Sequence, residues 1–171
     1  MQIARLLGAS TILGSSTNSD RRGRLHQSGV DDAINPTTPG GSAQILGRTI
    51  GSGGDIVIDM VTGPGLNETF AATAILGTIV NVGRLGAGTH AELNLDLHAF
   101  RRVNLVRATF RSRSLAKVGE STDLMQRDLW DVIASGEIAL PLDRTYPLTK
   151  AAKAHAHMSS DAHFGKIALI P

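Results

Sequence analysis

Two short runs of aliphatic and β-branched residues constrain the fold of this chain most strongly. Residues 55–59 (Asp-Ile-Val-Ile-Asp) and 78–82 (Thr-Ile-Val-Asn-Val) each have the length of a strand, and a glycine precedes each of them. The first run is apolar without alternation, which indicates burial on both faces, as in a parallel sheet. Helical patterns lie between such runs, so we expect an α/β fold.

The rest of the chain alternates in the same way. Further strands are expected at residues 11–13, 33–34, 104–110 and 165–170, helices at 1–9, 21–27, 43–47, 121–134 and 148–158, and a short helix or turn at 93–100. Another helix is expected at 66–76, because Leu66, Phe70 and Ala74 recur at i, i+4 and i+8.

The chain begins inside this alternation. Residues 1–9 form a helical pattern that ends in glycine and has no N-cap, and a strand pattern at 10–14 follows at once. A helix without a preceding strand suggests that a βαβ unit is entered one element late. We therefore expect the first strand of the sheet, and the loop that follows it, to be missing.

The composition narrows the classes of protein. No cysteine is present among the 171 residues, which excludes disulfides and thiolate zinc sites and fits a reducing, cytoplasmic setting. The longest apolar runs are far too short to span a bilayer, and no basic segment leads into an apolar signal region. We expect a cytoplasmic protein with no membrane partner.

The charge distribution raises nucleic-acid binding as an alternative. The formal net charge is only +2, but the sequence pI is about 9.4, and arginines gather between Arg101 and Arg113. Only six residues are aromatic, and they do not interleave with the arginines as in a stacking platform. A solvated basic face is therefore favoured, and we expect no nucleic-acid partner.

Two glycine-rich segments are candidates for phosphate loops. Residues 51–54 precede a strand, whereas a dinucleotide-binding loop follows a strand and opens a helix, so a plain turn is favoured there. Residues 83–88 do follow a strand, but their spacing is not G-x-G-x-x-G. Whether their glycines let the backbone approach a ligand at the carboxyl end of a strand stays open.

The segment at 14–22 carries a clearer chemical signal. In a dinucleotide fold, an acid at the end of the second strand accepts from the adenine ribose hydroxyls and selects NAD. Here glycine and hydroxyl residues take that place, with Asp20 available as a helix cap and with Arg21 and Arg22 behind it. Hydroxyls and a guanidinium would bind a 2′-phosphate, and an exposed, capped helix start is the alternative.

No catalytic centre is visible in the sequence. His155 and His157 are two residues apart and do not share a helix face, and no H-E-x-x-H pattern accompanies them, so we expect no metal site. No G-x-S-x-G elbow exposes a serine, and no carboxylate pair suggests acid–base chemistry. We therefore expect no catalytic residue within the chain.

The ordered set of motifs resembles the cofactor half of medium-chain dehydrogenases/reductases. The set comprises residues 2–9, 29–35, 55–59 and 77–83, with tail segments at 146–148, 154–155 and 163–169. The quinone oxidoreductase branch is the most similar, and residues 110–114 (Phe-Arg-Ser-Arg-Ser) resemble a segment of that branch. The resemblance covers nearly the whole chain.

The resemblance implies a Rossmann-type, doubly wound parallel sheet that binds NADP(H) and supports hydride transfer to a quinone or to an activated alkene or carbonyl. By position, Ser16 and Arg21 would hold the 2′-phosphate, and Val61 would pack near the adenosine. The cofactor-binding set is completed by Val82, Gly83 and Arg84 on the nicotinamide side and by Phe110, Arg111 and Lys166, which would close over the cofactor.

The chain departs from the family pattern at several points. The family's first strand, its glycine loop and its N-terminal substrate domain do not precede Met1, and Pro36 replaces an aromatic residue that the branch often places near the cofactor. We expect residues 1–171 to form a single truncated dinucleotide-binding domain with the family's closing segment, inactive as an isolated chain. A non-catalytic remnant, or a module completed by a partner chain, is the alternative. We also expect a homodimer through the edge strand at 104–110.

Overall fold

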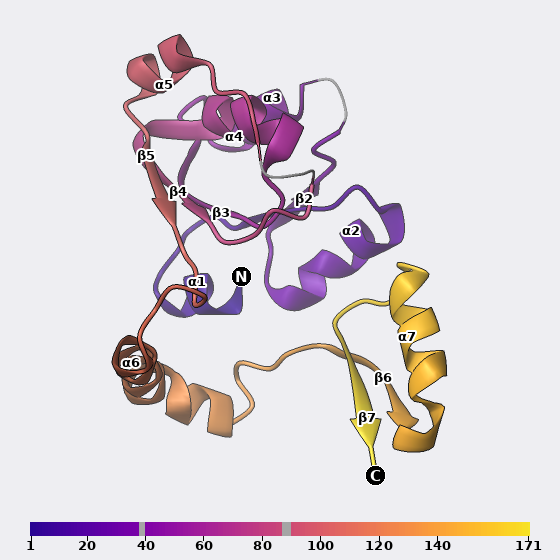
Figure 1. Cartoon of the computed structure of the whole chain (residues 1–171). Coiled ribbons are helices and arrows are strands. Elements are labelled where there is room, and N and C mark those ends of the chain that lie inside the picture. The colour runs from indigo at the N-terminus through magenta and orange to yellow at the C-terminus, as the bar shows by residue number, and fades with distance from the viewer. Residues whose placement is uncertain (38–39, 87–89) are drawn as a thin grey trace. The chain divides into compact units, whose positions relative to one another are not determined.

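The computed structural model describes residues 1–37, 40–86 and 90–171 and has the expected α/β character (Figure 1). Strands pair in parallel in a three-stranded sheet and in a C-terminal two-stranded sheet. The chain divides into two compact units. Unit 1 comprises residues 1–14, 18–33 and 122–171, and unit 2 comprises residues 15–17 and 34–121.

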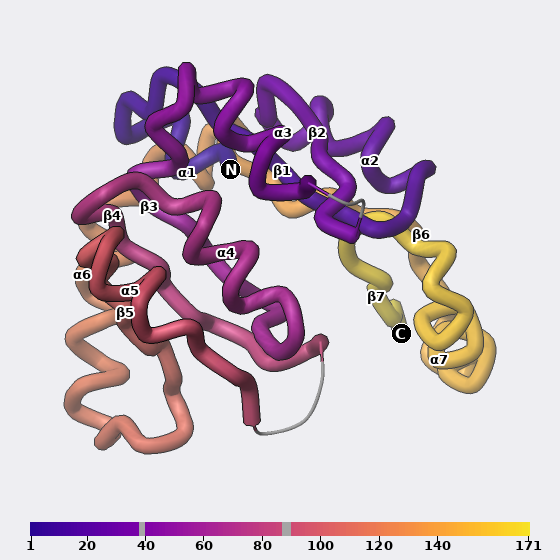
Figure 2. The backbone as a smooth tube through the Cα atoms, turned by 90° about the horizontal axis from the view of Figure 1, so that it is seen from above, coloured from indigo at the N-terminus to yellow at the C-terminus, as the bar shows by residue number. Residues whose placement is uncertain are grey.

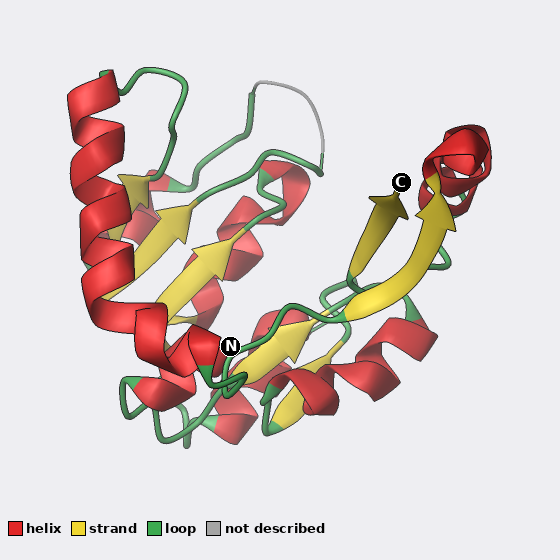
Figure 3. Cartoon of the chain, turned by 90° about the horizontal axis from the view of Figure 1, so that it is seen from below, coloured by secondary structure: helices red, strands yellow, loops and turns green. Residues whose placement is uncertain are grey.

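A parallel three-stranded sheet is the framework of unit 2. Its strands, in spatial order, are β3 (Gly54–Asp59), β4 (Thr73–Asn81) and β5 (Asn104–Arg107). The register pairs Asp59 with Asn81 and Asn81 with Arg107, so the three strands end side by side (Figure 3). All three strands are predicted by the sequence, although β5 ends at Arg107 rather than at residue 110.

The core of unit 2 lies between this sheet and its helices. The helices are α3 (Gly41–Arg48), η2 (Gly63–Gly65), α4 (Leu66–Ala72) and α5 (Leu95–Arg101), and the path of α4 beside β4 can be followed in Figure 2. Leu66 and Phe70 of α4 pack with Ile79 and Val103, and neither Phe70 nor Ile79 has any exposed surface. Helix propensity alone does not fix such short helices, so this packing stabilises them.

Only one face of β3 is buried. Val57 packs against the core, whereas Ile56 and Ile58 are 71% and 60% exposed among the described residues. The prediction of burial on both faces is therefore wrong for this strand. The reason is that the core of unit 2, with its helices α4 and α5, lies against the face that carries Val57.

The helix predicted at 66–76 is too long. α4 ends at Ala72 and β4 begins at Thr73, so Ala74 is buried in a strand rather than on a helix face. Leu76 takes a φ of +64°, and the register of β3 against β4 shifts between Gly54 and Ile56. Three apolar residues spaced by four could not separate a helix from a helix followed by a buried strand.

The N-terminal part of unit 1 follows the predicted alternation. Its elements are α1 (Gln2–Leu6), β1 (Leu13–Ser15), α2 (Ser19–Leu25), η1 (His26–Ser28) and β2 (Asp32–Ile34), and β1 pairs with β2. Gly8 and Gly29 adopt positive φ values of +87° and +85°, which confirms both glycine stops. In this pair, as in β3–β4–β5, strands that follow one another along the chain are neighbours in the sheet.

The cap predicted for α2 is wrong by two residues. Asn18, not Asp20, is the N-cap, and its Oδ1 accepts from the Arg21 backbone N–H at 3.0 Å. Asp20 lies inside the first turn, where its charge still favours the helix N-terminus.

The C-terminal part of the chain contains α6 (Leu115–Ala134), β6 (Leu142–Pro147), η3 (Leu148–Lys150), α7 (Ala151–Ser159) and β7 (Lys166–Ile170). The first residues of α6, up to Ser121, belong to unit 2, and the rest belongs to unit 1. β6 pairs in parallel with the predicted strand β7, with Tyr146 opposite Leu169. β6 was not predicted, because the polar run from Asp143 to Thr145 interrupts the apolar pattern of a strand. α6 begins at Leu115 rather than at residue 121, although Gly119 disfavours helix there.

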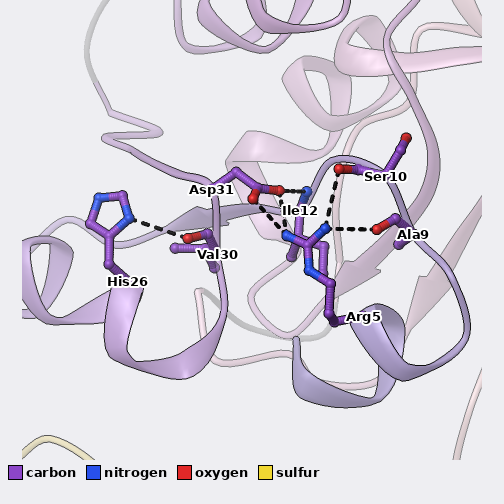
Figure 4. A network of polar contacts seen from close by, with 7 residues as sticks. All are labelled: Arg5, Ala9, Ser10, Ile12, His26, Val30 and Asp31. Atoms are coloured by element: carbon purple, nitrogen blue, oxygen red, sulfur yellow. Dashed lines mark hydrogen bonds and ion pairs between the residues drawn. The ribbon is translucent and has the colours of Figure 1, made fainter.

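Asp31 ties together the first elements of unit 1. Its two carboxylate oxygens accept from Arg5 Nη2 at 2.6 and 2.7 Å, and Oδ2 also accepts from the Ile12 N–H at 2.7 Å (Figure 4). Arg5 Nη1 donates to the Ala9 carbonyl at 2.8 Å. The hydrogen bond from Arg5, and then that from Ile12, hold the pKa of the Asp31 carboxyl below its ordinary value of 3.8.

Three expectations concern the organisation of the molecule. Within the described ranges, no helix is long and apolar enough to cross a bilayer. The single-domain organisation and the homodimer through β5 stay predictions.

Replacement of Phe70 by Ala should lower the free energy of unfolding by about 3–5 kcal/mol, because it removes a fully buried ring and leaves a cavity. Urea denaturation monitored by circular dichroism measures this loss. Phe100, which is 72% exposed, gives the matched control, and Phe100→Ala should change the value by no more than about 0.5 kcal/mol. Equal losses in the two variants would contradict the assignment of the core.

Asp31→Asn should destabilise the chain at neutral pH, and the deficit should vanish in acid. Because the pKa of Asp31 is lowered in the folded state, its carboxylate contributes to the free energy of unfolding at pH values above 3.8, the ordinary pKa. This contribution is lost as the pH falls through the lowered pKa. Thermal unfolding of both proteins across this range tests the sign. Asp123→Asn, on the exposed surface of α6, is the control, and a deficit that did not depend on pH would refute the role of the carboxylate.

Candidate functional site

Three polar side chains stand in a row where the strands of unit 2 end. Asp59, Asn81 and Arg107 are the last residues of β3, β4 and β5, and the register places each beside the next. Open α/β sheets bind ligands at the carboxyl ends of their strands, so this edge is the candidate site of unit 2. Asp59 is 8% and Asn81 is 2% exposed, and such buried polar groups need partners.

The carboxylate of Asp59 fixes the turn after β3. Oδ1 accepts from the backbone N–H groups of Val61 and Thr62 at 2.9 and 2.8 Å, and Oδ2 accepts from the Thr62 hydroxyl at 2.9 Å. Thr62 adopts φ +52° and ψ −156°, a conformation that a β-branched residue rarely takes. Such a conformation costs of the order of 1–3 kcal/mol, and the three hydrogen bonds to one carboxylate maintain it.

Asn81 joins this turn to Arg107. Its Nδ2 donates to Thr62 Oγ1 and to the Gly83 carbonyl, the latter at 3.1 Å, and its Oδ1 accepts from Arg107 Nη1 at 2.6 Å. These partners fix the orientation of the amide, since an NH₂ cannot face a guanidinium productively. The hydroxyl of Thr62 accepts from Asn81, and its own proton can be donated to Asp59 Oδ2 at 2.9 Å or to the Gly83 carbonyl at 3.1 Å.

The loop after β4 lies against the turn after β3. Val82 N–H donates to the Asp59 carbonyl at 2.8 Å, and Gly86 N–H donates to the Val61 carbonyl at 2.9 Å. A Cβ at Gly83 would collide with the Met60 carbonyl oxygen, so glycine is required there. Within the described part of this loop, Gly83 therefore allows close contact with the backbone of Met60. Residues 87–89 of the predicted glycine segment lie outside the described residues.

A cavity of about 320 Å³ opens beside the row of strand ends. It is lined by Thr62, Leu66, Asn81, His90, Ala91, Leu93, Leu105 and Arg107. Thr62, Asn81 and Arg107 are absent from the set of site residues that the sequence predicts. Asn81 and Arg107 could have been predicted from the sequence, because each is a polar residue at the end of an apolar strand and the ends of neighbouring parallel strands lie side by side.

Six of the predicted cofactor-binding residues lie in unit 2 beyond the ends of β3, β4 and β5. Val61 and Val82 are 54% and 42% exposed in the loops after β3 and β4, where apolar side chains are available to a ligand. Gly83 and Arg84 continue the loop after β4. Phe110, which is 67% exposed, and Arg111 follow β5, and the Arg113 guanidinium lies 5.3 Å from the Phe110 ring. The cofactor roles of these residues stay predictions.

The predicted 2′-phosphate pair is divided between the two units. Ser16 belongs to unit 2, where its N–H donates to the Ile34 carbonyl at 3.1 Å. Arg21 belongs to unit 1, where its Nη2 donates to Asp161 Oδ1 at 2.6 Å and its Nε donates to the His163 carbonyl at 3.1 Å. The structure therefore shows Arg21 engaged by a carboxylate and does not show the pair together.

A second cavity, of about 440 Å³, surrounds Arg21 in unit 1. It is lined by Asn18, Asp20, Arg21, Arg24, Ser160, Asp161, Ala162 and Phe164. The Arg24 guanidinium lies 4.5 Å from the centre of the Phe164 ring. Lys166, the remaining predicted site residue, begins β7, and its N–H donates to the Pro141 carbonyl at 2.8 Å.

Asp143 organises a further polar cluster that the sequence did not predict. Its Oδ1 accepts from the Phe164 N–H at 2.9 Å, and its Oδ2 lies 2.9 Å from His157 Nε2. The Phe164 N–H, and then His157, hold the pKa of the Asp143 carboxyl below its ordinary value of 3.8. This cluster ties β6, α7 and the turn before β7 to one another.

A family model described as zinc-binding dehydrogenase matches residues 28–169 of the chain. The residues at hand do not provide a site that fits zinc. The chain has no cysteine, and within the described ranges no group of three or more His, Asp or Glu side chains is placed to hold a metal ion.

Curated relatives are much longer than this chain. It is 32% identical over 171 residues to a mycocerosic acid synthase-like polyketide synthase of Mycolicibacterium smegmatis, with 98% of the chain and 8% of the relative covered. It is 28% identical over 176 residues to a highly reducing polyketide synthase of Aspergillus niger, with 98% of the chain and 7% of the relative covered. The chain thus spans less than a tenth of the length of these relatives.

Solved structures share the fold. An NAD-dependent alcohol dehydrogenase matches with a TM-score of 0.81 and 23% identity, over 99% of this chain and 46% of the other. A mycobacterial protein complexed with NADPH matches with a TM-score of 0.79 and 22% identity, over 99% of this chain and 52% of the other. A mycobacterial quinone oxidoreductase matches with a TM-score of 0.81 and 21% identity, over 99% and 51%. These matches confirm the predicted Rossmann-type fold.

Thr62→Val should lower the free energy of unfolding by about 1–3 kcal/mol, because the loss of one hydroxyl leaves Asp59 Oδ2 and Asn81 Nδ2 each short of a partner. Urea denaturation measures the change. Thr62→Ser keeps the hydroxyl and is the matched control, with a stability close to that of the parent chain. If the two variants were equally stable, the network at the strand ends would not support the fold.

Proposed function

The chain belongs to the zinc-binding dehydrogenase family, and from this premise we propose that it is the cofactor-binding portion of an NADP(H)-dependent oxidoreductase. The family match over residues 28–169 is the observation that carries the proposal. The open carboxyl edge of β3, β4 and β5 supports it, because dinucleotides bind at this edge in Rossmann-type sheets. NADP(H), when bound, would supply a hydride to the substrate.

The preference for NADP(H) over NAD(H) rests on the cavity around Arg21. No acidic residue stands where an NAD-selecting acid is expected, and Arg21 and Arg24 line the cavity together with Asp20 and Asp161. The Asp161 side chain that holds Arg21 is 71% exposed, so a phosphate can take its place without uncovering a buried carboxylate. One structural neighbour is an NADPH complex and another is NAD-dependent, so the fold alone does not decide between the two cofactors.

The remaining predicted residues have definite tasks in this proposal. Ser16 would add a hydroxyl at the phosphate end, and the exposed Val61 would pack against the adenosine. On the other side of the cofactor, Val82 would pack with Gly83 and Arg84. The residues that close over the cofactor would be Phe110, Arg111 and Lys166. All of these residues bind or orient, and none of them transfers a proton.

Reduction of an activated alkene or carbonyl on an acyl chain is the reaction that we favour. Several curated relatives are polyketide synthases, and one of them is named as highly reducing, which calls for hydride delivery to acyl chains. A quinone is the second candidate acceptor, supported by the structural likeness to a quinone oxidoreductase. In either case we propose that this chain is inactive alone and acts in the cytoplasm.

Two further features of the proposal concern partners. We retain the homodimer through β5 (Asn104–Arg107), whose exposed Leu105 and Val106 offer a strand edge with apolar side chains. A non-catalytic module that a partner chain completes is the alternative to a catalytic portion, since the chain spans only 8% of the first relative.

Arg21→Gln should weaken NADPH binding by about tenfold or more and leave NADH binding unchanged. A charge-assisted hydrogen bond contributes about 1.5–3 kcal/mol, and about 1.4 kcal/mol corresponds to a factor of ten. Fluorescence titration of both dinucleotides measures the effect.

Arg144→Gln, on the exposed surface of β6, is the matched control for the loss of a positive charge. An equal loss for NADH and NADPH would contradict the phosphate role of Arg21. If the parent chain bound neither dinucleotide, the proposed function of this chain would be wrong.

A further inference from the structure

We propose that the cavity at the ends of β3, β4 and β5 is a binding site for a small carboxylate with a short apolar tail, and that Arg107 recognises the carboxylate. The site lies in unit 2, on the side of the sheet that carries the Leu66–Phe70–Ile79 core. The proposal goes beyond dinucleotide binding and does not depend on it.

The charges around the cavity favour an anion. Arg107 and His90 are its only basic lining residues, and the described lining contains no acidic side chain. Within the described ranges, no carboxylate forms an ion pair with Arg107. The nearest acid in the row, Asp59, already accepts three hydrogen bonds from Val61 and Thr62, so it has little capacity to compete.

Arg107 is held in place by a neutral group. Its Nη1 donates to Asn81 Oδ1 at 2.6 Å, and Asn81 is itself 2% exposed and fixed by Thr62 and Gly83. A guanidinium has five N–H donors, so one bond to an amide leaves a fork available for a carboxylate. Because the amide carries no charge, the arginine is oriented without being neutralised. This distinguishes it from Arg5 and Arg21, which are both paired with carboxylates.

The rest of the cavity wall is apolar. Leu66, Leu93 and Leu105 line it together with Ala91. A volume of about 320 Å³ is at the small end of the range for ligand cavities, so it admits a short chain rather than a nucleotide. A bare phosphate would leave the leucines in contact with water, whereas an alkyl tail would cover them. A short-chain carboxylate can bind Arg107 with its carboxylate and cover the leucines with its alkyl chain.

The test is a titration of the full chain, isotope-labelled for NMR, with butyrate and separately with n-butanol, in the absence of any dinucleotide. Butyrate should bind about tenfold more tightly than butanol or better, since only butyrate makes charge-assisted hydrogen bonds to Arg107. The largest shifts should fall on the side-chain amide of Asn81 and on Leu66 and Leu105.

Arg107→Gln should abolish the preference for butyrate, whereas Arg102→Gln, which removes an exposed arginine at the end of α5, should retain it. If Arg107→Gln does not fold, Arg107→Lys replaces it, because lysine keeps the charge but not the planar fork, and affinity should fall several-fold.

Three results would overturn the proposal: equal affinity for butyrate and butanol, equal losses in the Arg107 and Arg102 variants, or inorganic phosphate binding as tightly as butyrate. None of these results bears on the proposed dinucleotide function, because no dinucleotide is present in the experiment.

Discussion

The parallel register of β3, β4 and β5 is the constraint on which the site of unit 2 depends. Because Asp59, Asn81 and Arg107 occupy paired positions at the same ends of their strands, an acid, an amide and a cation become neighbours although more than twenty residues separate each from the next. The acid fixes a turn, the amide links the turn to the cation, and the cation faces a cavity. A shift of one of these strands by one residue would move its polar side chain to the opposite face of the sheet and break the row.

The arginines of this chain differ in what their partners leave available. Arg5 is paired with Asp31, and Arg21 is paired with Asp161, so both charges are compensated inside the chain and both side chains fasten loops. Arg107 is bound by an amide and keeps its full charge toward a cavity. The basic pI therefore comes from arginines with different roles, some paired with carboxylates and one bound to an amide. Net charge alone does not distinguish these roles.

Local strain marks the same region. Thr62 holds a backbone conformation that glycine would adopt more readily. The hydrogen bonds that its turn donates to Asp59, and the one that its hydroxyl accepts from Asn81, maintain this conformation. Gly83, by contrast, is a position where glycine is required, because any side chain would collide with the Met60 carbonyl. The two loops at the carboxyl edge are thus fitted to each other by close backbone contact, which leaves the side chains of Val61 and Val82 exposed for a ligand.

The sequence by itself determined the fold class, the strands β1, β2, β3, β5 and β7, the second half of β4, and the family, because apolar runs, glycine stops and ordered motifs are local properties. The same local properties gave wrong predictions at two places. A helix pattern continued into a buried strand after Ala72, and polar residues interrupted the apolar pattern of β6. Only the tertiary structure decided which polar side chains meet. The contact of Asn81 with Arg107 depends on strand register, and the engagement of Arg21 by Asp161 depends on long-range packing, and no short pattern in the chain corresponds to either.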